Sequence, residues 1–68
     1  QAQAMGLLAQ RLTPREQDTA HLVMLGLSDK EIARRLDISI TTVRTHLDNA
    51  FRKVGAHNRA TLIHKLSP

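Results

Sequence analysis

The motif that begins an α-helix occurs twice in the first half of this chain, and this repetition constrains the fold more than any other feature. In Thr13-Pro14-Arg15-Glu16, threonine can cap a helix, proline suits the first helical position and glutamate can reach back to the cap. Ser28-Asp29-Lys30-Glu31 repeats the pattern. Gly26, between the motifs, suits the left-handed backbone just beyond a helix end. The sequence therefore predicts a helix that starts at Pro14 and stops at Gly26, and a short second helix after Ser28.

A third and a fourth helix are predicted in the second half of the chain. Asp37-Ile38-Ser39 forms a short break in which the serine can cap the next helix. Gly55 ends this third helix, and Asn58 can cap a fourth. Along 40–54, apolar residues recur on one helical face, at Val43, Leu47, Ala50, Phe51 and Val54. The predicted fold class is all-α: a compact four-helix domain that contains a helix-turn-helix.

The composition limits the kinds of protein that this chain can be. A length of 68 residues permits one small domain, and the lone aromatic residue, Phe51, suits packed helices better than sheets. There is no cysteine, and the four histidines lack the spacing of metal ligands. Neither a glycine-rich phosphate loop nor a nucleophile motif is present in the sequence. We therefore expect no enzyme activity, no cofactor and no bound metal.

The chain is expected to comprise two parts. Residues 1–11, rich in Ala, Gln and Leu, are interpreted as a linker or N-terminal extension able to form a helix, and residues 12–68 as the folded domain. The longest apolar run, Leu22–Leu27, is too short to cross a bilayer, and residues 1–10 lack the pattern of a signal peptide. We therefore expect a soluble, cytoplasmic protein with no membrane partner.

Positive charge is concentrated in the C-terminal half of the chain. The formal net charge is +4. Basic and acidic side chains are equal in number in residues 1–38, so the whole excess lies in residues 39–68, where Asp48 is the lone acidic residue. This distribution favours a polyanion, such as nucleic acid, as the partner of the second half.

The third helix carries polar groups on the face opposite its apolar side. At about 100° per residue, the outward positions include Thr41, Thr45 and Asp48, with Arg44 on one flank. Arginine can bind guanine O6 and N7 together, a threonine methyl can contact the thymine methyl, and aspartate can accept from cytosine N4. This face therefore suits the reading of DNA bases.

Several spaced motifs together resemble a known family. They are Leu12-Thr13-Pro14-Arg15-Glu16, Gly26-Leu27-Ser28, Lys30-Glu31-Ile32-Ala33-Arg34-Arg35-Leu36, Ile38-Ser39, Thr42-Val43-Arg44-Thr45-His46-Leu47 and Phe51-Arg52-Lys53-Val54-Gly55. The pattern is similar to the LuxR/GerE-type helix-turn-helix DNA-binding domain of quorum-sensing receptors and NarL-like response regulators. The resemblance covers Leu12 to Leu66.

The resemblance implies specific binding of double-stranded DNA by the C-terminal effector domain of a bacterial transcription regulator. The third helix, about 40–54, would enter the major groove, with base contacts from Thr41, Arg44, Thr45 and Asp48. DNA-backbone contacts would come from Thr42, His46, Arg52, Lys53, His57, Asn58 and Arg59. The fourth helix would form a homodimer interface through Ala60, Thr61 and His64. Location in the bacterial nucleoid and contact with RNA polymerase follow from the same role.

Asp48 departs from the family pattern, which usually has a neutral or basic residue at this position. It either selects cytosine or pairs with Arg44 or Arg52 one turn away, and the i,i+4 spacing favours pairing.

The sequence leaves two other functions of the domain open. One is a DNA-binding module like region four of a sigma factor, and the other is a helical protein-interaction module.

Overall fold

A computed structural model describes residues 7–67 of the chain. Most of these residues are helical. Within this range the elements are a 3-10 helix, η1 (Leu7–Arg11), and four α-helices, α1 (Pro14–Met24), α2 (Asp29–Leu36), α3 (Ile40–Val54) and α4 (Arg59–Leu66). The predicted all-α class and the predicted helix-turn-helix, α2 to α3, are confirmed. None of the helices within 7–67 is long and apolar enough to cross a membrane.

Both predicted capping boxes are formed. The backbone N–H of Glu16 donates to Thr13 Oγ1 over 3.2 Å, and the N–H of Thr13 donates to Glu16 Oε1 over 3.0 Å. The same reciprocal bonds join Ser28 and Glu31, over 3.2 and 2.8 Å. Each box satisfies backbone donors that the first turn of a helix leaves without partners, so α1 and α2 begin where the sequence predicts.

The turn between α2 and α3 is held by its backbone. Asp37 adopts the left-handed conformation, with φ 58° and ψ 48°, which short polar side chains tolerate better than most. Ile38 N–H then donates to Ala33 O over 3.0 Å, and Ser39 Oγ accepts from Thr42 N–H over 3.0 Å to cap α3. The chain therefore changes direction in the predicted three-residue break, and α3 starts in a defined orientation.

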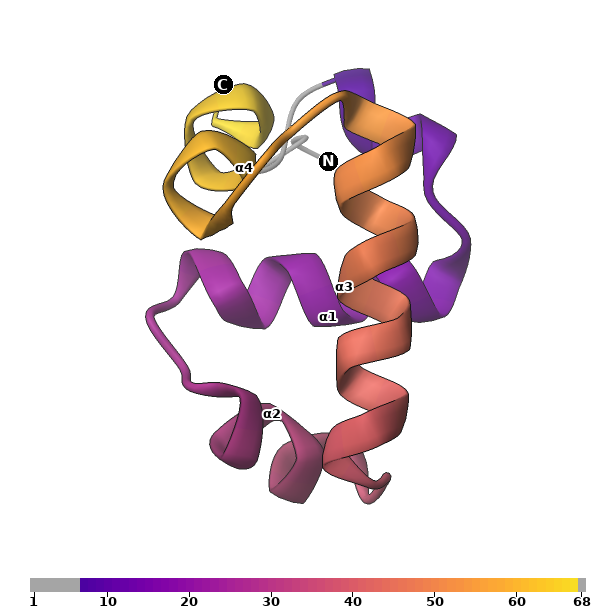
Figure 1. Cartoon of the computed structure of the whole chain (residues 1–68), viewed down its shortest axis with the longest axis vertical. Helices are drawn as coiled ribbons and strands as arrows, with labels where there is room; N and C mark the ends of the chain where they lie inside the picture. The colour runs from indigo at the N-terminus through magenta and orange to yellow at the C-terminus, as the bar shows by residue number, and fades with distance from the viewer. Residues whose placement is uncertain (1–6, 68) are drawn as a thin grey trace.

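The helix α3 runs along the whole molecule and organises the packing of the others. In Figure 1 it stands upright, with α1 crossing behind it, α2 at its lower end and η1 and α4 at its upper end. One face of α3 enters the core at Val43, Leu47, Ala50 and Val54, all of which are buried. Phe51, predicted to share this face, is only partly buried and packs against the edge of the core.

The segment just before residue 12 belongs to the packed unit. Ala9 is only 7% exposed, and η1 contacts both α3 and α4. Gln17 Nε2 donates to Ala9 O over 2.8 Å and to Leu12 O over 3.1 Å, which attaches η1 to α1. The packed core thus includes Ala9, which precedes the predicted domain boundary at residue 12. The sequence does not indicate this, because so short a helical turn leaves no periodic pattern of apolar residues. Residues 1–6 of the predicted extension lie outside the described residues.

A partly buried ion pair joins the start of α1 to the end of α3. Lys53 Nζ lies 2.8 Å from Glu16 Oε1, and the Glu16 side chain is only 5% exposed. Burial alone raises the pKa of Glu16, but hydrogen bonds from Lys53 and from the Thr13 backbone outweigh it and bring the pKa below its ordinary value of 4.5. Glu16 therefore stays ionised and supports both the α1 cap and the contact with α3.

We expect Glu16→Gln to lower the free energy of unfolding by about 1 to 2 kcal/mol at neutral pH, because glutamine keeps the cap but loses the charge that pairs with Lys53. Since the folded-state pKa of Glu16 is lowered, its contribution is present above pH 4.5 and is lost as the pH falls through that lowered pKa. Urea unfolding followed by circular dichroism at several pH values measures both effects.

Glu31→Gln is the matched control, because it makes the same change in the capping box of α2 at an exposed side chain. The pKa of Glu31 is also lowered, chiefly by the hydrogen bond from the Ser28 backbone, so some pH dependence is expected there as well. The loss of stability should be clearly smaller than in Glu16→Gln. Equal losses in the two variants would show that the Lys53 pair adds nothing to the fold.

Candidate nucleic-acid interface

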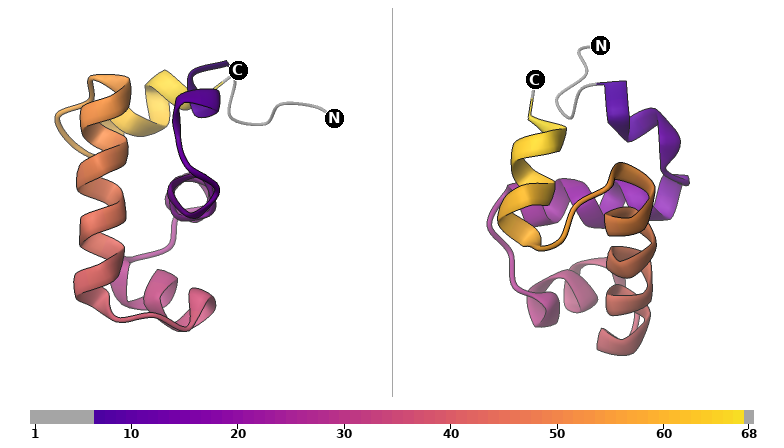
Figure 2. Two further views of the ribbon diagram at one scale, coloured as in Figure 1. Left: turned by 90° about the vertical axis from the view of Figure 1, so that its right-hand side faces the viewer. Right: turned by 45° about the horizontal axis from the view of Figure 1, so that its top comes forward.

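Within residues 7–67, no other helix covers the outer face of α3. Thr41, Arg44, Thr45 and Asp48 are all exposed, and they lie opposite the residues that α3 buries. In the left view of Figure 2, α3 stands at one side of the molecule, with α1, α2 and α4 on its other side. The structure thus brings the four residues predicted to contact bases onto one accessible surface, which we call the α3 outer face.

Two threonines near the start of α3 are held by local hydrogen bonds. Thr42 Oγ1 lies 2.9 Å from Ser39 Oγ, beside the cap of the helix. Thr45 Oγ1 donates to Thr41 O over 3.1 Å, which fixes the side chain and leaves the oxygen free to accept a further bond. The first turns of α3 therefore present ordered side chains to a partner.

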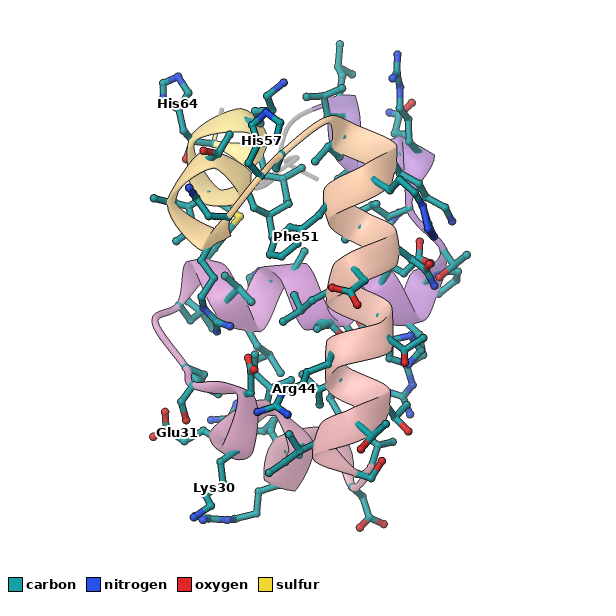
Figure 3. The ribbon with its side chains drawn as sticks, in the orientation of Figure 1. Lys30, Glu31, Arg44, Phe51, His57 and His64 are labelled. Carbon is teal, nitrogen blue, oxygen red and sulfur yellow. The ribbon has the colours of Figure 1, made fainter. Side chains whose placement is uncertain are left out.

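Arg44 extends from α3 toward the start of α2 (Figure 3). Its Nε lies 3.6 Å from Asp29 Oδ2, while its side chain remains 68% exposed. Asp29 Oδ1 also accepts from Arg59 Nη1, and Arg59 Nη2 donates to Leu27 O over 2.7 Å. A single carboxylate of α2 thus pairs with one arginine of α3 and one of α4. We call Asp29, Arg44 and Arg59 the Asp29 cluster.

The pairing that the sequence favours for Asp48 is not the one that forms. Arg44 pairs with Asp29, and Arg52 Nη2 donates to Asn49 Oδ1. Asp48 takes part in none of the ion pairs found within residues 7–67. An exposed i,i+4 pair is worth only a few tenths of a kcal/mol, so a carboxylate on a neighbouring helix readily competes for the arginine. Asp48 is therefore exposed beside Arg44 with its oxygens available.

The residues predicted to contact the DNA backbone fall into two groups. Arg52 and His57 are exposed, and Thr42 and His46 are half-buried on the flank of α3. The others already hold the fold together: Lys53 pairs with Glu16, Asn58 Oδ1 accepts from Thr61 N–H over 2.8 Å to cap α4, and Arg59 belongs to the Asp29 cluster. The sequence predicted the cap at Asn58 but not the structural roles of Lys53 and Arg59, because the partners of these two residues are distant in the chain.

The predicted dimer surface lies on α4. Ala60 and His64 are exposed and Thr61 is half-buried, while Leu62 and Leu66 of the same helix are fully buried. Figure 3 shows His64 at the end of the molecule opposite Lys30 and Glu31 of α2. The helix thus has one face committed to the core and a second face of small and polar side chains that is accessible.

In the folded chain, part of the positive charge of the C-terminal half is paired with acidic residues of the N-terminal half. Arg44, Lys53 and Arg59 all pair with acidic residues of the N-terminal half, at Asp29 and Glu16. Conversely, three exposed basic residues of α2 form no ion pair within the described range: Lys30, Arg34 and Arg35. The positive surface is therefore shared between α2 and α3, whereas the sequence predicts it on the second half alone.

Across residues 7–67, the His, Asp and Glu side chains do not gather into any group of three that could hold an ion. What the geometry provides is a capped helix, a tight turn and a second helix whose outer face is polar and open. These features define a helix-turn-helix protein.

Comparison with known families identifies the class more closely. Residues 10–66 match the model of the family described as bacterial regulatory proteins, luxR family. The match covers nearly the whole chain and includes α1 to α4. The chain therefore belongs to this family of DNA-binding transcription regulators, as the resemblance in the sequence implied.

Curated relatives are transcription regulators of several bacteria. The chain is 48% identical over 52 residues to an HTH-type transcriptional regulator of Mycobacterium tuberculosis, and these residues are 76% of this chain and 6% of that protein. It is 48% identical over 52 residues, again 76% of this chain, to the monoamine regulon transcriptional regulator of Klebsiella aerogenes, of which 23% is covered. It is 45% identical over 49 residues to the nitrate/nitrite response regulator protein NarL of Escherichia coli, covering 72% of this chain and 23% of NarL. The chain thus spans a quarter or less of the length of these relatives.

We expect Arg59→Ala to lower the free energy of unfolding by about 1 to 2 kcal/mol, because Leu27 O and Asp29 lose a charged donor. Arg52→Ala serves as the control, since the bond that its exposed side chain makes within residues 7–67 is to Asn49, a near neighbour on the same helix. It should change stability by no more than about 0.5 kcal/mol. Thermal and urea unfolding measure both, and a neutral Arg59→Ala would show that the contact between α4 and α2 does not stabilise the fold.

Proposed function

We propose that this domain binds specific sequences in double-stranded DNA by inserting α3 into the major groove. The observation that carries the proposal is the α3 outer face, which is polar, hydrogen-bonded at its first turns and exposed among residues 7–67. An α-helix fits the major groove, where each base pair presents a distinct set of donors, acceptors and methyl groups. Membership of the luxR family of regulators supports the same function.

The base contacts follow from the chemistry of four side chains. Arg44 donates to guanine O6 and N7, and the Thr45 methyl packs against a thymine methyl. Asp48, whose carboxylate is exposed, accepts from cytosine N4. Thr41, at the start of α3, completes the set that reads one half-site.

The phosphate contacts come from the flanks of α3 and from the segment that leads into α4. The exposed Arg52 supplies a positive charge, and Thr42 and His46 reach the groove edge from the flank of α3. Further donors come from His57, Asn58, Arg59 and Lys53. Where these side chains already make structural bonds, their remaining N–H groups contact the phosphates. Such contacts orient the protein and give affinity that falls with salt, but they carry little sequence information.

The accessible face of α4 pairs two copies of the domain. Ala60, Thr61 and His64 are small or polar enough for two helices to approach closely. A two-fold pair places two α3 helices on successive turns of DNA, so the cognate site contains two half-sites. The chain is the DNA-binding part of a longer bacterial regulator that acts in the nucleoid and contacts RNA polymerase, and its sensor lies elsewhere in that protein.

Selection from random duplexes identifies the preferred site, and Arg44→Ala then tests base reading. We expect the variant to lose about 1 to 3 kcal/mol of discrimination at a single base pair, because its guanine contact is removed. Arg52→Ala should weaken all duplexes alike and reduce the dependence of log affinity on log salt by about one unit. If Arg44→Ala weakens the cognate and random duplexes equally, Arg44 is not a base reader.

We expect His64→Glu to abolish cooperative binding to a site with two half-sites, because two like charges would meet across the α4 pair. Affinity for a single half-site should stay the same. Lys65→Gln is the matched control, since it changes the net charge by the same amount at a neighbouring position outside the predicted interface. Fluorescence anisotropy with one-site and two-site duplexes separates these cases, and retained cooperativity in His64→Glu would place the dimer contact elsewhere.

A further inference from the structure

We propose that Asp29 is a positioning residue that aims Arg44 at its base and thereby sets how strongly the domain discriminates guanine at that position. The inference rests on the proposed function, because it assigns a determinant of specificity to the same interface. Asp29 lies on α2, outside the reading helix, and neither the helical pattern nor the family motifs mark it as part of the binding surface.

The geometry of Arg44 leaves its guanine-binding edge free. Asp29 Oδ2 faces the Nε of Arg44 at 3.6 Å. The two terminal amino groups, Nη1 and Nη2, therefore remain free of this contact and can donate together to guanine O6 and N7. The ion pair with Asp29 biases a long, flexible side chain toward one direction before DNA arrives, which reduces the entropy lost on binding.

Asp29 is itself held in place. Arg59 Nη1 lies 2.5 Å from Oδ1, the oxygen that Arg44 does not use, and Arg59 is fixed in turn by its bond to Leu27 O. The Asp29 side chain is only 28% exposed, less than half the exposed fraction of Arg44. The carboxylate therefore has one side bound to the scaffold and the other turned toward the reading arginine.

The contribution of the Arg44 pair to stability is small, because Arg44 is largely exposed and an exposed ion pair adds little. In this proposal, the ion pair affects the recognition of DNA bases more than the stability of the fold. A carboxylate beside the interface also repels phosphate, so it costs affinity for any DNA. Removing the charge of Asp29 should therefore have two opposite effects. Loss of the contact that orients Arg44 weakens the discrimination of bases, whereas loss of the repulsion leaves binding to random DNA equal or makes it stronger.

Asp29→Asn tests the inference in the 68-residue chain. At the base pair that Arg44→Ala identifies, we expect the preference for guanine to fall about two- to fivefold, the range that an exposed ion pair can supply. Affinity for a random duplex should stay the same or rise. In the Arg44→Ala background the same change should leave the base preference unaltered, because Asp29 acts through Arg44.

Glu31→Gln is the matched control, since it removes a carboxylate from the same turn of α2 without touching Arg44. It should raise random-DNA affinity to a similar extent and keep the base preference. Circular dichroism and thermal unfolding verify that each variant is folded. In the free chain, the Nε–H NMR signal of Arg44, assigned by its loss in Arg44→Ala, should move in Asp29→Asn and stay in Glu31→Gln.

The outcomes separate this inference from the function on which it rests. If Arg44→Ala changes no base preference, the proposed reading role is wrong and the inference falls with it. If Arg44→Ala changes the preference and Asp29→Asn does not, only the inference is overturned. An equal loss of preference from Asp29→Asn in both backgrounds would also overturn it, because Asp29 would then act on the fold through Arg59.

Discussion

The structure depends on the burial of one face of α3. Val43, Leu47, Ala50 and Val54 enter the core, and α1 and α2 both pack on this helix. Because the apolar face repeats with the helical period, turning α3 by one residue, about 100°, would bury polar groups and expose the core. The direction in which Arg44 and Thr45 point is thus determined by the apolar residues on the other side of the same helix. The orientation of the proposed reading surface therefore depends on the core behind it.

The features that sequence reasoning predicted are those whose causes are local. Thr13, Ser28, Ser39 and Asn58 each cap a helix by accepting from a backbone N–H three residues ahead, so the signal and its partner lie in one short stretch of sequence. The same holds for the turn at Asp37 and for the apolar face of α3. Within residues 7–67, these local signals were sufficient for the order of the helices and for the face that α3 leaves open.

The features that the sequence did not predict connect residues far apart in the chain. No periodicity relates Asp29 to Arg59 or Glu16 to Lys53, and the simple i,i+4 rule suggested the wrong partner for Arg44. A charge count along the chain likewise located the positive surface incompletely, because folding brings acidic groups of the first half against basic groups of the second. Only the packing of α1, α2 and α4 around α3 determines which charges remain free for a partner.

One oxygen atom, Glu16 Oε1, accepts hydrogen bonds both from the Thr13 backbone and from Lys53. The first bond is local to α1, whereas the second crosses the molecule to the last turn of α3. Fraying of α1 at its first turn would therefore also break the ion pair with Lys53, although Glu16 and Lys53 are far apart in the chain. Through this shared acceptor, the contact with α3 adds to the free energy that opposes fraying at the start of α1.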